Sequence, residues 1–243
     1  MGVPTRRGFL KLGIGTAVGG VGLFTFLANE VERFTVTRLD MGLSSKAIFL
    51  TDLHIHLGTP YLDRLADTIS REDPDIIFLA GDTVDEYTAD RAAVEGFIKS
   101  LEAGEKFAVM GNHEYWSEQT PWMDRLLREN GFTVLYNNSA VSTVGRITGL
   151  DWDEGRHYPA LHTDGVVVVH DPNAALNISG NCLILAGHTH GGVVLGQTTL
   201  YSNSYFVRGR YEIGPGTTLY VSRGLGQIIP VRINSPPELV ILT

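Results

Sequence analysis

Five short apolar runs, each ending in side chains that can bind a metal ion, are the feature that most restricts the fold of this chain. Each run is rich in Ile, Val, Leu or Phe and is bounded by turn residues, the pattern of a buried β-strand. The runs are "KAIFLTD" (46–52), "DIIFLAGD" (75–82), "KFAVMGN" (106–112), "GVVVVHD" (165–171) and "CLILAGH" (182–188). Because ligands of open α/β sheets bind beyond the carboxyl ends of the strands, we expect these polar residues to converge.

Helical patterns separate the early strands, and the second half of the chain changes character. Apolar residues recur at helical spacing over 61–71 and 89–101, and a third helix is expected over 121–130. After Gly131 short strands and turns follow. A chain of 243 residues without a composition break or internal repeat is expected to form one large domain. The predicted fold class is therefore α/β, a layered domain with a mostly β second half.

The polar residues at the strand ends are carboxylates, amides and imidazoles. In chain order they are Asp52, His54, Asp82, Asp85, Asn112, His113, His170, His188 and His190. Alternate residues of a strand share a face, so His188 and His190 start roughly 6–7 Å apart. That spacing is wide for one ion and suits two ions about 3.5–4 Å apart. Each block alone is typical of a capped turn, but five blocks at successive strand ends indicate a metal centre.

Together the blocks resemble the calcineurin-like metallophosphoesterase superfamily, whose pattern is D-x-H, G-D-x-x-D, G-N-H-[DE], a later His and G-H-x-H. All five occur in order between Asp52 and His190. The tail "LYVSRGLGQIIPVRINSPPELVILT" resembles a bacterial exported or membrane-associated phosphodiesterase branch of that superfamily. The resemblance implies a four-layer αββα sandwich of two mixed β-sheets flanked by helices, with a dinuclear metal site at the carboxyl ends of the strands.

The resemblance also implies a role for each site residue. One ion would be held by Asp52, His54, Asp82 and His190, and a second by the bridging Asp82 with Asn112, His170 and His188. This mixture of oxygen and nitrogen ligands suits two ions of Mn, Fe or Zn. A hydroxide between the ions would be the nucleophile, and His113, oriented by Asp85, would protonate the leaving oxygen.

Residues 1–28 resemble a twin-arginine export signal that precedes a metallophosphoesterase domain over 29–243. The motif from Thr5 to Lys11 contains Arg6 and Arg7, and 17 uncharged residues follow from 12 to 28. No small residue stands three positions before Asn29, so an uncleaved membrane anchor and a released enzyme both stay open. The expected location is the periplasm or the outer face of the cytoplasmic membrane.

Composition narrows the expected partners. The net charge is −8, and no basic run occurs beyond the N-terminus, which argues against a nucleic-acid groove. The single cysteine, Cys182, excludes an intramolecular disulfide and a Cys-rich zinc site. The expected partners are a phosphate-ester substrate, phospholipid among the candidates, together with the membrane and the twin-arginine export machinery.

Three functions fit this pattern. The favoured one is a phosphodiesterase or pyrophosphatase acting on a phospholipid head group or another cell-envelope phosphodiester. The second is a phosphomonoesterase of the phosphoprotein-phosphatase type, but those enzymes carry Arg where this chain has Glu86. The third is a catalytically silent scaffold, which is expected to lack several of the site residues that this chain retains. Outside the blocks, we expect His56 in a solvated loop and Trp116 in ordinary packing.

Overall fold

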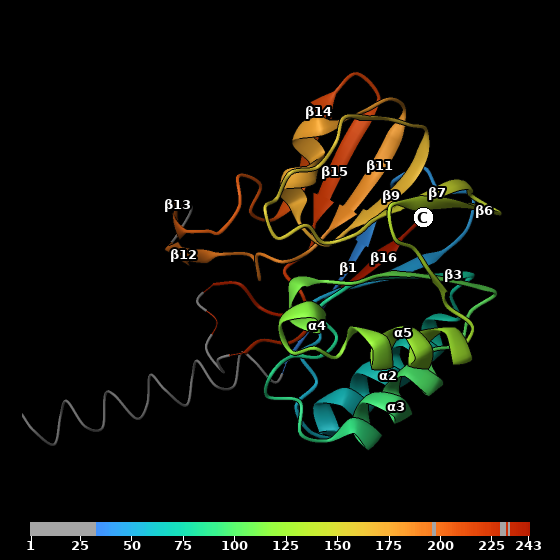
Figure 1. Cartoon of the computed structure of the whole chain (residues 1–243), viewed down its shortest axis with the longest axis vertical. Helices are drawn as coiled ribbons and strands as arrows, with labels where there is room; N and C mark the ends of the chain where they lie inside the picture. The colour runs from blue at the N-terminus through green and yellow to red at the C-terminus, as the bar shows by residue number, and fades with distance from the viewer. Residues whose placement is uncertain (1–32, 196–197, 229–231, 233) are drawn as a thin grey trace, which may run out of the picture.

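The computed structural model describes residues 33–195, 198–228, 232 and 234–243 (Figure 1). The predicted export signal over 1–28 lies outside these residues. Two six-stranded sheets lie face to face, with helices beneath the lower sheet in the view of Figure 1. Within the described residues, no helix has both the length and the apolar character needed to cross a bilayer.

The first sheet combines the early strands with the last strand of the chain. Its order is β1 (Thr35–Leu39), β16 (Glu238–Leu242), β2 (Ala47–Leu50), β3 (Ile76–Ala80), β4 (Glu105–Val109) and β5 (Thr133–Val134). The strands from β2 to β5 are parallel, whereas β16 runs antiparallel to β2 and parallel to β1. The amino ends of β1 and β16 therefore lie at the same edge as the carboxyl end of β2.

The second sheet is also mixed. Its order is β14 (Gly209–Gly214), β15 (Thr217–Val221), β11 (Cys182–Ala186), β9 (Gly165–Val169), β7 (Gly145–Leu150) and β6 (Asn138–Ser142). The four strands in its middle are parallel, and the two outer strands are antiparallel to their neighbours. Two short pairs complete the β-structure, β8 (Leu161–His162) with β10 (Ile178–Ser179), and β12 (Val193–Leu195) with β13 (Thr198–Tyr201).

The core has three parts because the central strands are buried on both faces. In β2, Phe49 packs between the sheets, while Ile48 and Leu50 pack toward the helices. This arrangement explains why the strands read as continuous apolar runs rather than as alternating patterns. A further cluster of apolar side chains, Cys182 among them, covers the outer face of the second sheet.

Three amphipathic helices form the layer on the first sheet: α2 (Pro60–Glu72), α3 (Arg91–Ser100) and α5 (Thr120–Glu129). Helix α2 starts where Thr59 caps the amide of Leu62 and Pro60 occupies the first turn, and it buries Leu65 and Ile69. The outer layer on the second sheet is thinner and consists of the 3₁₀-helix η1 (Pro172–Asn177) and loops. The predicted sandwich of two mixed sheets is thus confirmed.

One short helix was absent from the sequence-based prediction. Helix α4 (Asn112–Trp116) forms directly after β4, inside the block read as the end of a strand. Its first turn closes because the Glu114 carboxylate accepts a hydrogen bond from the backbone N–H of Gly111 at 2.8 Å. We call the carboxyl ends of β2, β3, β4, β9 and β11 the ligand edge; α4 and the β12–β13 hairpin mark it at the left of Figure 1.

Candidate metal centre

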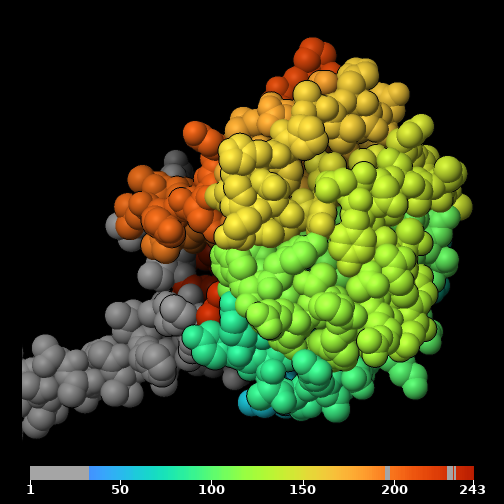
Figure 2. All heavy atoms as spheres, in the orientation of Figure 1, coloured from blue at the N-terminus to red at the C-terminus, as the bar shows by residue number. Residues whose placement is uncertain are grey.

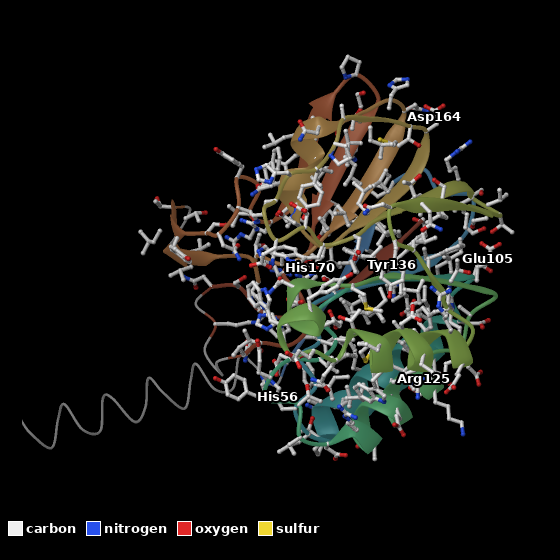
Figure 3. All side chains as sticks on the ribbon, viewed as in Figure 1. His56, Glu105, Arg125, Tyr136, Asp164 and His170 are labelled. Carbon is white, nitrogen blue, oxygen red and sulfur yellow. The ribbon has the colours of Figure 1, made fainter. Side chains whose placement is uncertain are left out.

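The residues predicted as metal ligands come together at the ligand edge. They form two groups of potential ligands, Asp52 with His54 and His190, and Asp82 with His170 and His188. Within each group the candidate ligand atoms lie within 4.8 Å of one another. His54 Nε2 is also 3.8 Å from Asp82 Oδ2, so the carboxylate of Asp82 lies next to both groups. Figure 3 places His170 between the two sheets at this edge.

Neighbouring acceptors orient three of these imidazoles. The Nδ1 atoms of His54, His170 and His190 lie 2.8 Å from Asp85 Oδ2, 2.7 Å from the Ala80 carbonyl oxygen and 3.1 Å from the Gly226 carbonyl oxygen. A ring that donates from Nδ1 keeps a free lone pair on Nε2, which is how metal-binding histidines are usually held. His54 Nε2 is buried and has no hydrogen-bond partner among the described residues. An orphaned imidazole nitrogen beside carboxylates fits a metal ligand.

The second group also fits a metal ion, because three possible ligand atoms surround His170 Nε2. His170 Nε2 lies 3.0 Å from Asp82 Oδ2, 3.1 Å from Asn112 Oδ1 and 3.1 Å from His188 Nδ1. Burial opposes a charge on His170, but the charge and hydrogen bond of Asp82, together with the charge of Asp52, outweigh burial and raise the pKa of His170 to about 10. Burial lowers the pKa of His188 to about 2. A metal ion would replace the proton held between Asp82 and His170, and the neutral His188 suits ligation.

Strained backbone turns the predicted ligands toward the centre. Five of them have a positive φ: Asp52 (51°), His54 (41°), Asp82 (51°), His188 (72°) and His190 (49°). Left-handed conformations cost a non-glycine residue on the order of 1 kcal/mol or more, and they cluster at functional sites. At Asp52 the surroundings hold the strained geometry, because its carboxylate accepts the backbone N–H of His188 at 3.0 Å.

Glu114 is a functional support that the sequence reasoning missed. Its buried carboxylate accepts hydrogen bonds from the backbone N–H groups of Gly111, Asp82, Thr83 and Val84 at 2.6 to 3.2 Å. These bonds join the loops after β3 and β4. Gly111 permits this close approach, since a Cβ there would stand 2.2 Å from Asp82 Oδ1. The acidic position that ends the G-N-H-[DE] block was the signal for this role.

The structure corrects the predicted partner of His113. The carboxylate hydrogen-bonded to His113 Nδ1 belongs to Glu86, at 2.9 Å. Asp85 instead turns inward, where its Oδ2 lies 2.8 Å from His54 Nδ1 and 2.7 Å from His56 Nε2. The reason is the local turn, in which Asp85 Oδ1 accepts the backbone N–H of Tyr87 at 2.7 Å and fixes the carboxylate in a buried position.

Asp85 therefore supports a predicted metal ligand rather than the predicted acid. Burial opposes its charge, but the hydrogen bonds from His54 and His56 outweigh burial and lower the pKa of Asp85 to about 2. His56 lies in a loop as predicted, but it is not free in solvent, because its side chain is only 30% exposed and is paired with Asp85. Figure 3 shows His56 below His170 on the same side of the molecule.

His113 lies at the mouth of the centre. Its backbone N–H donates to Asp82 Oδ1 at 2.9 Å, and its ring meets the rings of His54 and Trp116 edge-on, with centroids 5.1 and 5.0 Å away. Trp116 was predicted to pack in the ordinary way, but it is 49% exposed at the rim of the centre. Asn203 was missed because it lies far along the chain, yet its amide is 3.0 Å from His188 Nε2.

Comparisons of the sequence with known proteins find phosphoesterases and metallophosphoesterases. The family profile described as calcineurin-like phosphoesterase matches residues 45–192. An uncharacterized metallophosphoesterase of Aquifex aeolicus is 31% identical, covering 88% of this chain and 91% of the relative. The uncharacterized metallophosphoesterase Cj0846 of Campylobacter jejuni is 30% identical over 88% of this chain, which spans 62% of that relative.

Two further similarities involve proteins with a stated activity. The phosphodiesterase YaeI of Escherichia coli is 29% identical, with 81% of each chain covered. A crystal structure of the Pseudomonas putida nuclease MPE is similar with a TM-score of 0.42 and 17% sequence identity, over 78% of this chain and 80% of the other.

Proposed function

The chain belongs to the calcineurin-like phosphoesterases, hydrolases of phosphoester bonds, and from this membership we propose that it acts on diesters or pyrophosphates of the cell envelope. The proposed substrates are phospholipid head groups or other envelope phosphodiesters. The name of the similar YaeI protein, a phosphodiesterase, supports this choice. We also propose export by the twin-arginine route to the outer face of the cytoplasmic membrane, which the motif around Arg6 and Arg7 supports.

The position of Glu86 carries the preference for diesters. Its carboxylate is hydrogen-bonded to His113 and its side chain is 41% exposed, so it adds a negative charge at the mouth of the centre. A phosphate monoester carries nearly two negative charges at neutral pH, because its second pKa is about 6, whereas a diester carries one. Glu86 therefore disfavours a monoester more strongly than a diester. A monoesterase of the phosphoprotein type would have a cation in this place.

The residues at the ligand edge would hold two metal ions. Asp52, His54 and His190 would hold one metal ion, and Asp82, His170 and His188, with Asn112 beside them, would hold the other. Mn, Fe or Zn suits this ligand set. Bound ions would supply positive charge to the phosphoryl group and make a nucleophile available at neutral pH.

The proposed acid is His113. Its Nδ1 faces Glu86, which leaves Nε2 as the atom that would pass a proton to the leaving oxygen. The hydrogen bond with Glu86 would keep the ring oriented. Asp85 would act at a distance from the proton transfer, by orienting His54.

The substrate preference is tested by assaying the purified full chain with bis(p-nitrophenyl) phosphate and with p-nitrophenyl phosphate. We expect a higher kcat/KM for the diester, and Glu86→Arg should shift the ratio of the two rates toward the monoester. A wild-type enzyme that prefers the monoester would overturn the proposal. Lipid pyrophosphate and phospholipid substrates, assayed in the same way, distinguish the proposed envelope substrates.

The export proposal has its own test. Replacing Arg6 and Arg7 together by lysine should keep the chain in the cytoplasm, as measured by fractionation of the producing cells. Extraction of membranes with alkaline carbonate then separates an anchored chain from a released one. Unchanged export of the double variant would contradict the proposed route.

A further inference from the structure

An apolar groove opens directly beside the candidate metal centre. It has a volume of about 480 Å³ and runs between the loop after β2, the start of α2 and the loop after β15. Its apolar lining comes from Leu53, Ile55, Leu57, Leu62, Leu225 and Ile228. None of these six residues belongs to the ligand set.

We propose that this groove binds the apolar chain of an amphiphilic phosphodiester whose phosphate lies at the metal centre. The inference rests on the proposed phosphodiesterase function and adds the part of the substrate that the metal centre does not touch. Apolar pockets with few polar groups are typical sites for such ligands, since each buried methylene strengthens binding about fourfold.

The groove and the metal centre share walls. His54 lines the groove and belongs to the first ligand group. Gly226 also lines the groove, and its carbonyl oxygen holds His190 Nδ1 at 3.1 Å. An alkyl chain bound in the groove would therefore place the phosphate of the same substrate beside the predicted metal ligands.

Two polar side chains in the groove are already engaged elsewhere. His56 lies 2.7 Å from Asp85 through Nε2, and the Tyr61 hydroxyl donates to the Leu225 carbonyl oxygen at 2.6 Å. Burial raises the pKa of Tyr61 above its usual range, so the hydroxyl stays neutral. The groove thus offers the Tyr61 ring as apolar surface rather than as a polar contact.

The first described strand of the polypeptide, β1, begins near this groove. Thr35 begins β1 at the ligand edge, two strands from β2 or about 10 Å at ordinary strand spacing. Phe34 meets Tyr61 edge-on, with ring centroids 5.7 Å apart. Only six residues lie between Ala28, the end of the uncharged run, and Thr35, which limits their separation to about 25 Å. A bilayer that held the run over 12–28 would therefore lie close to the groove.

Several large apolar side chains are exposed around the centre. Leu57, Tyr87 and Tyr201 are 58%, 64% and 67% exposed, and Trp116 is half-exposed. They come from two loops, the helix α4 and the strand β13, and Figure 2 shows the β12–β13 hairpin standing out from the body. Exposed apolar side chains gathered around a site mark surfaces that contact lipid or another partner. This rim suits a substrate drawn from a bilayer.

The test measures how the rate depends on chain length. The full chain, in nanodiscs of a neutral glycolipid that contains no phosphodiester, is assayed with p-nitrophenyl alkyl phosphates from methyl to hexyl, which share one leaving group. We expect kcat/KM to rise at least tenfold from methyl to hexyl, since one fully buried methylene is worth about fourfold. Leu57→Gln and Ile228→Gln should each reduce the hexyl-to-methyl ratio at least threefold.

Leu176→Gln is the matched control, because Leu176 is 55% exposed on η1, away from the groove. Substrate partition into the lipid is the same for every variant, so a change in the ratio reports the groove. A flat wild-type ratio, as expected if residues 12–28 or a second copy of the chain fill the groove, would overturn the inference. So would an equal effect of Leu176→Gln. Failure to cleave any diester would instead count against the proposed function itself.

Discussion

Replacing Glu86 by glutamine should slow phosphodiester cleavage without loss of metal. Glutamine keeps an oxygen acceptor for His113 Nδ1, so the substitution removes mainly the charge. At the 2.9 Å separation, two unit charges interact by about 1.4 kcal/mol in a water-like dielectric and by about 6 kcal/mol at an effective dielectric constant near 20. Because the Glu86 side chain is 41% exposed, the lower value is the better guide. It sets an upper limit of about tenfold on the fall in kcat, because part of this interaction is present before the proton leaves the ring.

The assay compares two leaving groups. A weakly acidic phenol needs more help from a proton donor than p-nitrophenol does, so the loss should be larger with methyl phenyl phosphate than with methyl p-nitrophenyl phosphate. Metal content, measured by plasma mass spectrometry, should match the wild type. Asp85→Asn is the paired variant, and it should weaken metal affinity about 10- to 100-fold through His54. If Asp85→Asn slowed turnover with metals retained while Glu86→Gln had no effect, Asp85 would be the partner of His113 after all.

Three further predictions concern the acid, the ions and the loop support. His113→Ala should lower kcat by about 10²–10⁴ with metal content unchanged, and loss of metal from this variant would refute its role as the acid. Chelation should abolish activity, and adding back metal at a hundred times its Kd should stabilise the protein by about 2.7 kcal/mol, or roughly 5–10 °C in Tm; activity that survives chelation would contradict the metal centre. Glu114→Gln should lower the free energy of unfolding by about 2–4 kcal/mol, because an amide NH₂ would face backbone donors, and an unchanged thermal melt would show that these bonds contribute little.

Much of the ligand edge could be predicted from local patterns. The five apolar runs are strands, and the residues that follow them meet because parallel strands end at a common edge. The pairing of β16 between β1 and β2 has no local signal, since it joins residues about two hundred positions apart. Register of that kind depends on tertiary packing rather than on sequence periodicity.

The partner of His113 could not be predicted from the motif, which pointed to Asp85 where the structure has Glu86. The two acids are adjacent, so a pattern of residue types does not say which one turns inward. The turn decides it, because the amide of Tyr87 captures Asp85 Oδ1 and the longer Glu86 side chain is left to reach His113. Positive φ values at the predicted ligands were not predicted either, because Asp and His adopt that conformation more often than other non-glycine residues but still only in a minority of cases.

The place of β16 affects the order in which the molecule is completed. Within the described sheet, β16 is the hydrogen-bonded neighbour of β1 and follows every other strand along the chain. During translation, β1 stays without a partner until residues 238–242 have left the ribosome. The backbone N–H of Glu238 also holds the Gly224 carbonyl oxygen at 3.0 Å, and Gly224 packs against Asp52. Closure of the first ligand group therefore waits for β16, and a nascent chain stalled before β16 would carry its carboxylates and imidazoles without the enclosure that positions them.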